Sequence, residues 1–184
     1  LEHLLEGIGP DSGIVLRSVG GYGGGGVQVV RRAGSGVSVN EADPISPNRI
    51  AASLQRPTGT TTIITKYVKQ HASSGGIFSR SVNTIRLLTM IRPGTNEPFI
   101  ARAIHRFGTD RSVPVDNWTQ GGLTAPVDLR SGTLGPAVNN YRQAPIAFFD
   151  RHPDTNALIT GKVIPRWDEV KRVVLNLAER FAFL

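Results

Sequence analysis

The feature that most constrains the fold is a glycine-rich run between two short apolar segments. Residues 20–26 are all glycine except Tyr22, and they separate Ile14–Leu16 from the valine-rich stretch 27–30. The second segment is too short and too rich in β-branched residues to be a helix. The pattern therefore predicts a β-hairpin with a glycine loop at its tip.

This glycine loop has two interpretations. Glycine N–H groups can approach a phosphate closely because no Cβ stands in the way. The loop has neither the GxxxxGK[ST] pattern of a Walker loop nor the following helix of a dinucleotide loop. It is therefore either a phosphate-binding loop of another kind or a flexible hairpin tip. Arg17, on the strand that enters the loop, could reach a phosphate or be a solvated cation.

The rest of the chain alternates between strand-like segments and turns, and it ends in one clear helix. β-Branched and apolar runs predict five further strands, of which the second and third form one hairpin and the last two another. These strands are expected at 60–65, 84–91, 99–107, 123–129 and 133–138. Apolar residues at helical spacing predict a helix from Trp167 to Phe181, and a shorter helix is expected at 46–54. The fold class is therefore α+β.

Three arginines are expected on one face of the hairpin formed by residues 84–107. Arg102 and Arg106 alternate with apolar residues on the second strand, and Arg86 lies on the first. Since a guanidinium binds phosphate oxygens in pairs, arginines projecting from one sheet face can hold a triphosphate. They can also form the polar outer face of an antiparallel sheet. Ile100 is expected on the same face as Arg102.

Arg86 shares its predicted face with Leu88 and Met90. A cation on such a partly apolar face is costly to bury without an anionic partner. That partner is either a bound phosphate or a carboxylate of the chain such as Asp116.

Two polar motifs follow the hairpin. Asp116 and Asn117, ahead of the Gly121–Gly122 pair, can hold a metal–phosphate or a substrate amine, or they can cap a turn. The motif at 152–155, His-Pro-Asp-Thr, is predicted to be a structured turn, because its proline and aspartate explain it without a catalytic role.

Composition excludes several kinds of site. The sequence has no cysteine, which excludes disulfides, zinc–thiolate centres, iron–sulfur clusters and thiol catalysis, and fits a reducing cytosol. No segment approaches the roughly 18 apolar residues of a membrane span, so we expect a cytoplasmic protein. The net charge of +7 indicates an anionic partner or a diffuse basic surface. Most cations are spaced singly along strands, which favours a phosphorylated small molecule over nucleic acid.

The order of these motifs resembles that of ATP-grasp ligases. The glycine hairpin is followed by a hinge at 65–71, by Asn-Thr-Ile-Arg at 83–86, and by the Asp-Asn-x-x-x-Gly-Gly segment at 116–122. The sequence is most similar to the sugar-transfer-associated ATP-grasp group, which is related to the alpha-L-glutamate ligases. The likeness covers about residues 12–181 and is specific between 78 and 175. It implies two lobes with mainly antiparallel sheets and the nucleotide between them.

The resemblance also implies roles for individual residues. The glycine loop would close over the phosphates of ATP, and the hinge would read the adenine edge through backbone groups. Arg86 and Arg106 would face the triphosphate and an acyl phosphate, and Asn117 would lie near the γ-phosphate. The residues implied for ATP binding are Arg17, Gly23, Gly24, Gly25, Gly26, Lys66 and Val68. ATP and Mg²⁺ would be the cofactors.

The sequence departs from the family pattern at three places. Arg17 stands where the family usually has lysine, and Lys66 stands where it usually has glutamate at the hinge. The acidic strand and Glu-x-Asn pair that hold magnesium in the family would follow Leu184. Asp128 with Asn139 imitates that motif, but it precedes the final helix and is interpreted as unrelated. We therefore expect a domain incomplete at both ends, with a small lobe at 1–66 and the central part of a larger lobe at 67–184.

The resemblance implies an ATP-dependent ligase that joins a carboxylate to an amine or thiol through an acyl phosphate, in polysaccharide or cell-envelope biosynthesis. Two alternatives remain open. The first is a degenerate, non-catalytic nucleotide-binding or scaffold domain, which the altered hinge and missing metal motif would favour. The second is a basic nucleic-acid-binding module. Whether the chain is an enzyme is left open at this point.

Overall fold

The computed structural model describes residues 12–21, 23–34, 36–46, 48–50, 52, 61–140, 142 and 145–181. It contains two antiparallel sheets and few helices, which confirms the α+β class. The elements in chain order are β1 (Gly13–Ser18), β2 (Gln28–Ala33), β3 (Gly36–Val39), β4 (Thr62–Lys66), α3 (Ala72–Gly75), β5 (Ile85–Ile91), β6 (Pro98–Phe107), η1 (Trp118–Gln120), β7 (Leu123–Pro126), β8 (Ala137–Val138), β9 (Phe148–Phe149) and α4 (Trp167–Arg180).

The first sheet has the strand order β3-β2-β1-β4. β1 and β2 pair from Gly13 opposite Arg31 to Leu16 opposite Gln28, and the glycine run joins them. The predicted glycine hairpin is therefore confirmed. Ile14, Leu16 and Val30 lie in one buried cluster on one face of this sheet. The opposite face is left for contacts with the rest of the chain, and it carries Arg17.

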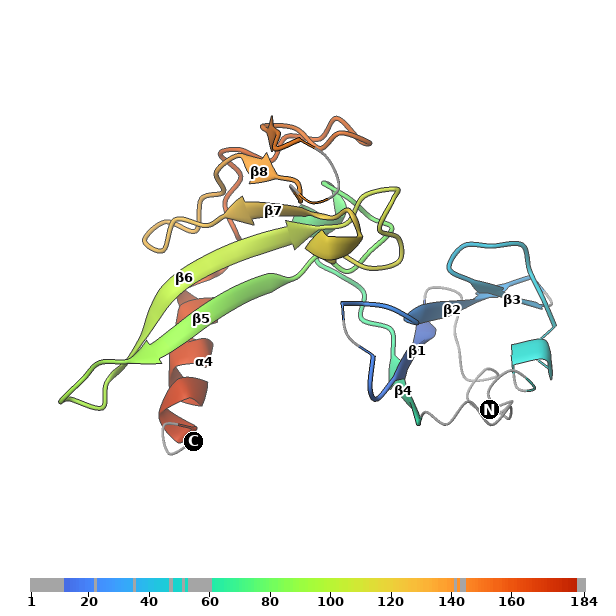
Figure 1. Ribbon diagram of the computed structural model, residues 1–184, viewed down its shortest axis with the longest axis horizontal. Coiled ribbons are helices and arrows are strands. Elements are labelled where there is room, and N and C mark those ends of the chain that lie inside the picture. The colour runs from blue at the N-terminus through green and yellow to red at the C-terminus, as the bar shows by residue number, and fades with distance from the viewer. Residues whose placement is uncertain are drawn as a thin grey trace.

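The second sheet has the strand order β5-β6-β7-β8-β9. Its longest part is the β5–β6 hairpin, which extends away from the rest of the molecule, with α4 beneath it (Figure 1). The core lies between this sheet and α4, where Ala103, Phe107 and Trp167 are buried. The predicted hairpins at 84–107 and 123–138 are both confirmed, the second with Thr124 opposite Val138.

A bulge in the β5–β6 hairpin corrects one prediction. Leu88 pairs with Arg102, but Thr89 pairs with Ile100, so β6 contributes one extra residue between them. A bulge of this kind reverses the alternation of side chains beyond it. Ile100 therefore faces the same side as Thr89, and the prediction that it shares a face with Arg102 was wrong.

The final helix begins and ends almost where its apolar spacing predicts. Trp167 is buried, and its indole Nε1 donates to the Leu129 carbonyl over 3.0 Å. Gly132 lies under this ring with a φ of +74°, and a Cβ there would come within 2.6 Å of the indole. Only glycine fits that turn. The helix expected at 46–54 is helical at 48–50, and much of its remainder lies outside the described residues.

No helix in the described part of the chain has the length and apolar character needed to span a membrane.

Candidate functional site

The glycine loop contacts the segment that precedes β7. The Gly23 carbonyl accepts a 2.7 Å hydrogen bond from the Gln120 side chain, at the end of η1. Gly24 has a φ of +82°, and a Cβ on it would lie 2.9 Å from a methyl group of Val115. Gly25 and Gly26 are exposed, and a Cβ on Gly26 would meet no atom of the described residues within 4 Å. Gly23 and Gly24 thus hold the loop against the segment before β7, and Gly25 and Gly26 form its exposed tip.

The β5–β6 hairpin presents three arginines on one face. Arg86 lies opposite Ile104, which sits between Arg102 and Arg106 on β6. Residues directly opposite one another in an antiparallel pair point to the same side of the sheet. The structure therefore brings these three arginines to the face that turns away from α4, as the sequence predicts. Arg86 and Arg102 are exposed.

Arg106 is part of a polar junction at the start of the hairpin. Its guanidinium lies 3.1 Å from the Asp116 carboxylate and donates to the Thr84 hydroxyl over 2.6 and 3.0 Å. Asp116 also accepts bonds from the Thr84 amide, at 2.8 Å, and hydroxyl, at 2.5 Å. The side chains of Arg106 and Asp116 are only 17% and 8% exposed. The carboxylate suggested as a partner for Arg86 thus belongs to Arg106.

Asn117 caps the short helix η1. Its side-chain oxygen accepts from the Thr119 amide over 2.8 Å and from the Thr119 hydroxyl over 2.5 Å. Gly121 follows with a φ of +107°, and a Cβ on Gly122 would come within 2.6 Å of the Asp116 carbonyl. Of the interpretations left open by the sequence, this geometry matches the capped turn. The turn also positions Gln120, which holds the glycine loop.

The hinge residues lie at the edge of the first sheet. Lys66 ends β4 and is exposed, and Val68 beyond it is also exposed. Between them, the Tyr67 amide donates to the Gly13 carbonyl over 2.8 Å. The Arg31 guanidinium lies 4.3 Å from the centre of the Tyr67 ring. Gly13, between these two side chains on the central strand, leaves room for the contact.

A hollow of about 260 Å³ opens beside this pair. It is lined from the first sheet by Val29, Arg31 and Tyr67, and from the other part of the chain by Val113 and Pro114. The sequence pattern did not indicate a role for Tyr67 itself, although this residue lies inside the proposed hinge. The sequence pattern also assigned Arg31 no role, because its only distinction there is its place next to Arg32.

A group of ion pairs joins the two parts of the chain beside the hollow. Arg80 donates to Glu41, in the turn after β3, and to Asp110, in the loop after β6, both at 2.6 Å. The hydrogen bond that Arg80 donates to Glu41 is the main cause that raises the pKa of Arg80. Partial desolvation lowers this pKa, and Asp110 raises it further. Nothing in the sequence pointed to this contact, because its members are 30 and 39 residues apart.

The described residues offer no metal centre. Among them, no three histidine, aspartate or glutamate side chains gather closely enough to hold an ion. Asp128 accepts bonds from the Arg130 amide and from the amide and hydroxyl of Ser131, at 2.7 to 3.1 Å. These bonds, chiefly that of the Ser131 hydroxyl, lower the pKa of Asp128. Asp128 therefore caps a turn, as its interpretation as a false metal motif requires.

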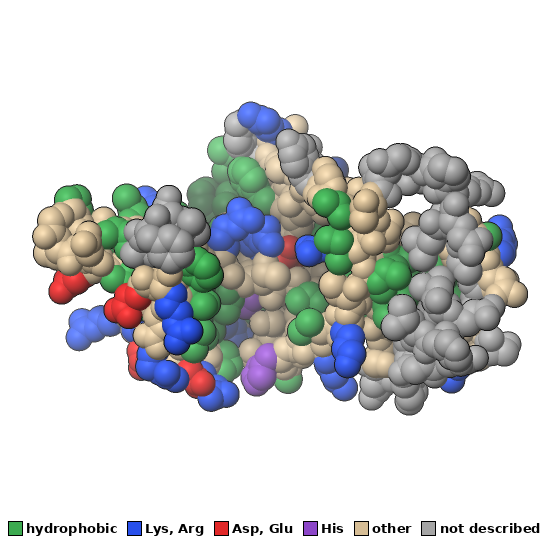
Figure 2. All heavy atoms as spheres, turned by 90° about the horizontal axis from the view of Figure 1, so that it is seen from below, with side chains coloured by type: hydrophobic (Ala, Val, Ile, Leu, Met, Phe, Trp, Pro, Cys, Tyr) green, Lys and Arg blue, Asp and Glu red, His purple; other side chains and the backbone are tan. Residues whose placement is uncertain are grey.

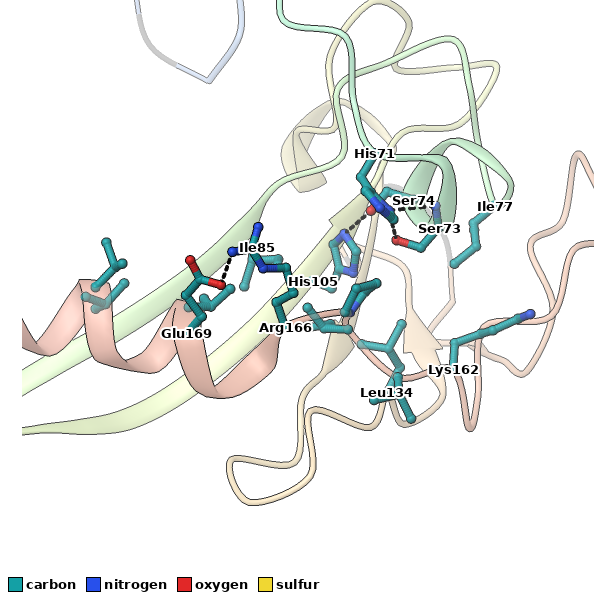
Figure 3. Close-up of a pocket in the computed structure, with 16 residues that line it drawn as sticks. His71, Ser73, Ser74, Ile77, Ile85, His105, Leu134, Lys162, Arg166 and Glu169 are labelled. Carbon is teal, nitrogen blue, oxygen red and sulfur yellow. Dashed lines mark hydrogen bonds and ion pairs between the residues drawn. The ribbon is translucent and has the colours of Figure 1, made fainter.

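The opposite face of the second sheet holds a separate cavity of about 510 Å³, between β5, β6, α3 and α4. His71 and His105 point toward Ser73 and Ser74 on one side of it, and Lys162 points away (Figure 3). His105 is buried, and this burial lowers its pKa from 6.5 to about 4. The sequence pattern did not reveal this cavity.

The motif at 152–155 is a structured turn, as predicted. The His152 ring is buried and stacks on Phe78, with 4.9 Å between the ring centres. Its Nε2 lies 2.7 Å from the Gly108 carbonyl, and its Nδ1 accepts from the Asp154 amide over 3.3 Å. Both ring nitrogens are thus occupied by backbone groups, which leaves no atom for proton transfer.

The comparison with protein families agrees with the arrangement of these motifs. No curated protein and no solved structure matches the chain. The model of one family, described as sugar-transfer associated ATP-grasp, matches residues 1–184. The chain therefore belongs to the sugar-transfer associated ATP-grasp family.

Proposed function

We propose that the chain binds ATP between its two sheets, with the triphosphate under the glycine loop. The proposal rests mainly on two contacts of the glycine loop: Gly23 with Gln120, and Gly24 with Val115. These contacts place the loop next to the face of the β5–β6 hairpin that carries Arg86 and Arg106. The open tip at Gly25 and Gly26 leaves backbone N–H groups for phosphate oxygens. Family membership supports nucleotide binding in general.

The cations around this space fit a triphosphate unequally. Arg17 lies on β1 at the loop, and Arg86 is exposed on the hairpin without a carboxylate partner in the described part of the chain. Arg106 shares its charge with Asp116, so it would mainly hold the junction in place while its remaining N–H groups face the phosphates. Arg86 would therefore carry most of the charge neutralisation. Asn117 would act through the turn that it caps.

The base of the nucleotide would lie at the hinge. The backbone of Lys66 and Val68 would read its edge, and the hollow beside Tyr67 has apolar walls from Val29 and Pro114. This hollow lies at the start of β1, whereas the glycine loop lies at its end. A nucleotide would thus extend along β1, with the base at one end and the phosphates at the other.

The reaction would be the activation of a carboxylate. ATP supplies the phosphoryl group: a carboxylate oxygen attacks the γ-phosphorus, ADP leaves, and an amine or another nucleophile then displaces phosphate from the acyl phosphate. The chain's arginines would orient the two anions and offset their repulsion, which are the main contributions in phosphoryl transfer. The described residues lack a fitting magnesium site, so no step is assigned to the metal.

Arg86→Met tests this assignment. Because Arg86 is exposed and unpaired among the described residues, the variant should keep the wild-type melting temperature without ligand. It should lose most of the rise in melting temperature that millimolar ATP with Mg²⁺ gives the wild type. Arg172→Met on α4 removes the same charge elsewhere and should keep the full rise. A full ATP-induced rise in Arg86→Met would contradict the proposed role of Arg86.

A non-catalytic nucleotide-binding domain is the second candidate, and the altered hinge, with Lys66 where the family usually has glutamate, favours it. Isothermal titration and a phosphate-release assay on the same chain separate the two functions. We expect binding of ATP with slow turnover. Rapid magnesium-dependent hydrolysis would exclude the non-catalytic candidate, and the absence of any binding heat at millimolar ATP would exclude both.

A further inference from the structure

The arginine face continues along the β5–β6 hairpin well beyond the proposed nucleotide site. Leu88 lies opposite Arg102, and Met90 lies opposite Phe99, whose ring is covered by the Arg92 guanidinium at 5.4 Å. Leu88 and Met90 are 53% and 51% exposed. We call this surface the arginine stripe, and it consists of Arg86, Leu88, Met90, Arg92 and Arg102.

The arginine stripe has no acidic partner in the part of the chain that the structure describes. None of its three arginines takes part in an ion pair there, whereas Arg80, Arg106, Arg166 and Arg172 each lie against a carboxylate. Figure 2 draws the molecule from below, where α4 lies, and shows carboxylates mainly at the end that carries the hairpin and α4. The arginine stripe lies on the face of the sheet that turns away from α4. Unneutralised cations in a row attract an anionic ligand of matching length.

The spacing of the stripe indicates an extended ligand. Arg102 lies opposite Leu88, which is two residues after Arg86 on β5, and Arg92 follows Leu88 by four residues. At about 3.3 Å per residue, the three guanidinium groups are distributed over roughly 20 Å of hairpin. The exposed leucine and methionine between them can contact the apolar parts of a chain that passes over the sheet.

We propose that the arginine stripe binds an extended, carboxylate-bearing polymer and delivers one of its carboxylates to the site of activation. This proposal rests on the proposed function, because that function requires a carboxylate next to Arg86. The neighbouring carboxylates of the same polymer would lie on Arg102 and Arg92. Several weak contacts along one chain add up to an affinity that no single carboxylate reaches.

A carboxylate polymer fits this surface better than a nucleic acid does. Single-stranded nucleic acid binds through aromatic rings on which bases stack. Phe99, opposite Met90, is the described aromatic ring beside the stripe, and Arg92 already covers it. The protruding part of the hairpin is a two-stranded ribbon with α4 beneath it (Figure 1).

The probe for the experiment is fluorescein-labelled poly-L-glutamate of about 20 residues, and binding to the full chain is followed by fluorescence anisotropy. Two double variants remove the same charge from opposite sides of the sheet. Arg92→Gln with Arg102→Gln alters the stripe, and Arg172→Gln with Arg180→Gln alters α4. The stripe variant should bind the polymer at least tenfold more weakly than the wild type, and the α4 variant within about twofold. Free glutamate should bind at least a hundredfold more weakly than the polymer.

ATP-induced stabilisation is measured on the same samples and should be unchanged in both variants. If ATP does not stabilise the wild type, the proposed function is refuted. The anisotropy measurement tests polymer binding independently of that result. Equal losses in the two variants would show a diffuse charge effect and overturn the stripe. Tighter binding of an oligothymidylate than of polyglutamate at equal salt would contradict the proposal that the ligand is a polymer of carboxylates. Failure of the wild type to bind polyglutamate would overturn the proposal as a whole.

Discussion

Arg106 and Arg86 lie on the same face of neighbouring strands, but their surroundings differ. Arg106 is largely buried against Asp116 and Thr84, at the end of the hairpin that meets the glycine loop. Arg86 is exposed, two residue pairs further along the hairpin, without a carboxylate partner among the described residues. A buried ion pair whose groups are hydrogen-bonded stabilises the fold, whereas an exposed, unpaired cation is available to bind a ligand. The difference separates the junction from the open part of the hairpin.

Removal of Arg106 should have the largest effect on stability. Arg106→Met leaves the Asp116 carboxylate buried with only the Thr84 groups, and stranding a buried charge costs about 3 kcal/mol or more. Urea unfolding measures this loss. Arg86→Met should change the free energy of unfolding by less than about 0.5 kcal/mol, as is usual for an exposed side chain.

A second variant separates the stranded charge from lost packing. Arg106→Met combined with Asp116→Asn removes both charges, so it should be more stable than Arg106→Met alone. If Arg106→Met and Arg86→Met lose equal stability, the distinction between the junction and the open hairpin is wrong.

Much of the fold could be predicted because it depends on local patterns. The glycine run, the alternation in β5 and β6 and the helical spacing from Trp167 each reflect one element and its immediate neighbour. The bulge after Leu88 could not be predicted, since one extra residue leaves no mark on the composition. It is this bulge that turns Ile100 to the other face.

The candidate site could be predicted only in its outline. The face that carries Arg86 and Arg106 follows from alternation, but the choice of partner for Asp116 depends on where the loop after β6 returns. Arg80 illustrates the same limit, because Glu41 and Asp110 approach it only once the chain has folded. Sequence patterns predict which side of a strand a residue occupies, and long-range packing decides what it meets.

Acidification should destabilise the chain through His105, on the buried face of the same strand as Arg106. Burial lowers its pKa from 6.5 to about 4, so between these values the unfolded chain binds more protons than the folded chain. Stability therefore falls as the pH drops from about 6.5 to about 4. At roughly 1.4 kcal/mol per pKa unit, the full loss is about 3 kcal/mol.

The measurement is urea unfolding at several pH values in wild type, His105→Gln and His71→Gln. His105→Gln should lose most of the slope between pH 6.5 and 4, whatever its stability at neutral pH. His71 is exposed, so its variant should keep the slope. An unchanged slope in His105→Gln would show that another group is responsible.

A substitution in the glycine loop tests how firmly the loop is seated on the junction. Gly24→Ala places a methyl group 2.9 Å from Val115 in a left-handed backbone conformation, which should cost about 1–2 kcal/mol. The methyl group of Gly20→Ala would meet no atom of the described residues within 4 Å, so this variant should be nearly neutral. Urea unfolding and ATP titration should show a loss of stability and of ATP affinity in Gly24→Ala only. Equal behaviour of the two variants would mean that the loop does not depend on this contact.

Loss of the exposed ion pairs of Arg80 should have the smallest effect on the free energy of unfolding, in contrast to loss of the buried pair of Arg106. Its side chain is 45% exposed, and those of Glu41 and Asp110 are 41% and 59% exposed. Arg80→Gln should therefore cost about 1 kcal/mol or less, and salt should screen most of this difference. Most of the cost of Arg106→Met should persist at about 1 M sodium chloride, because that pair is largely buried and salt screens it much less. Unfolding of both variants at low and high salt gives the contrast directly, and a salt-independent cost at Arg80 would show that this contact is as well shielded as the junction.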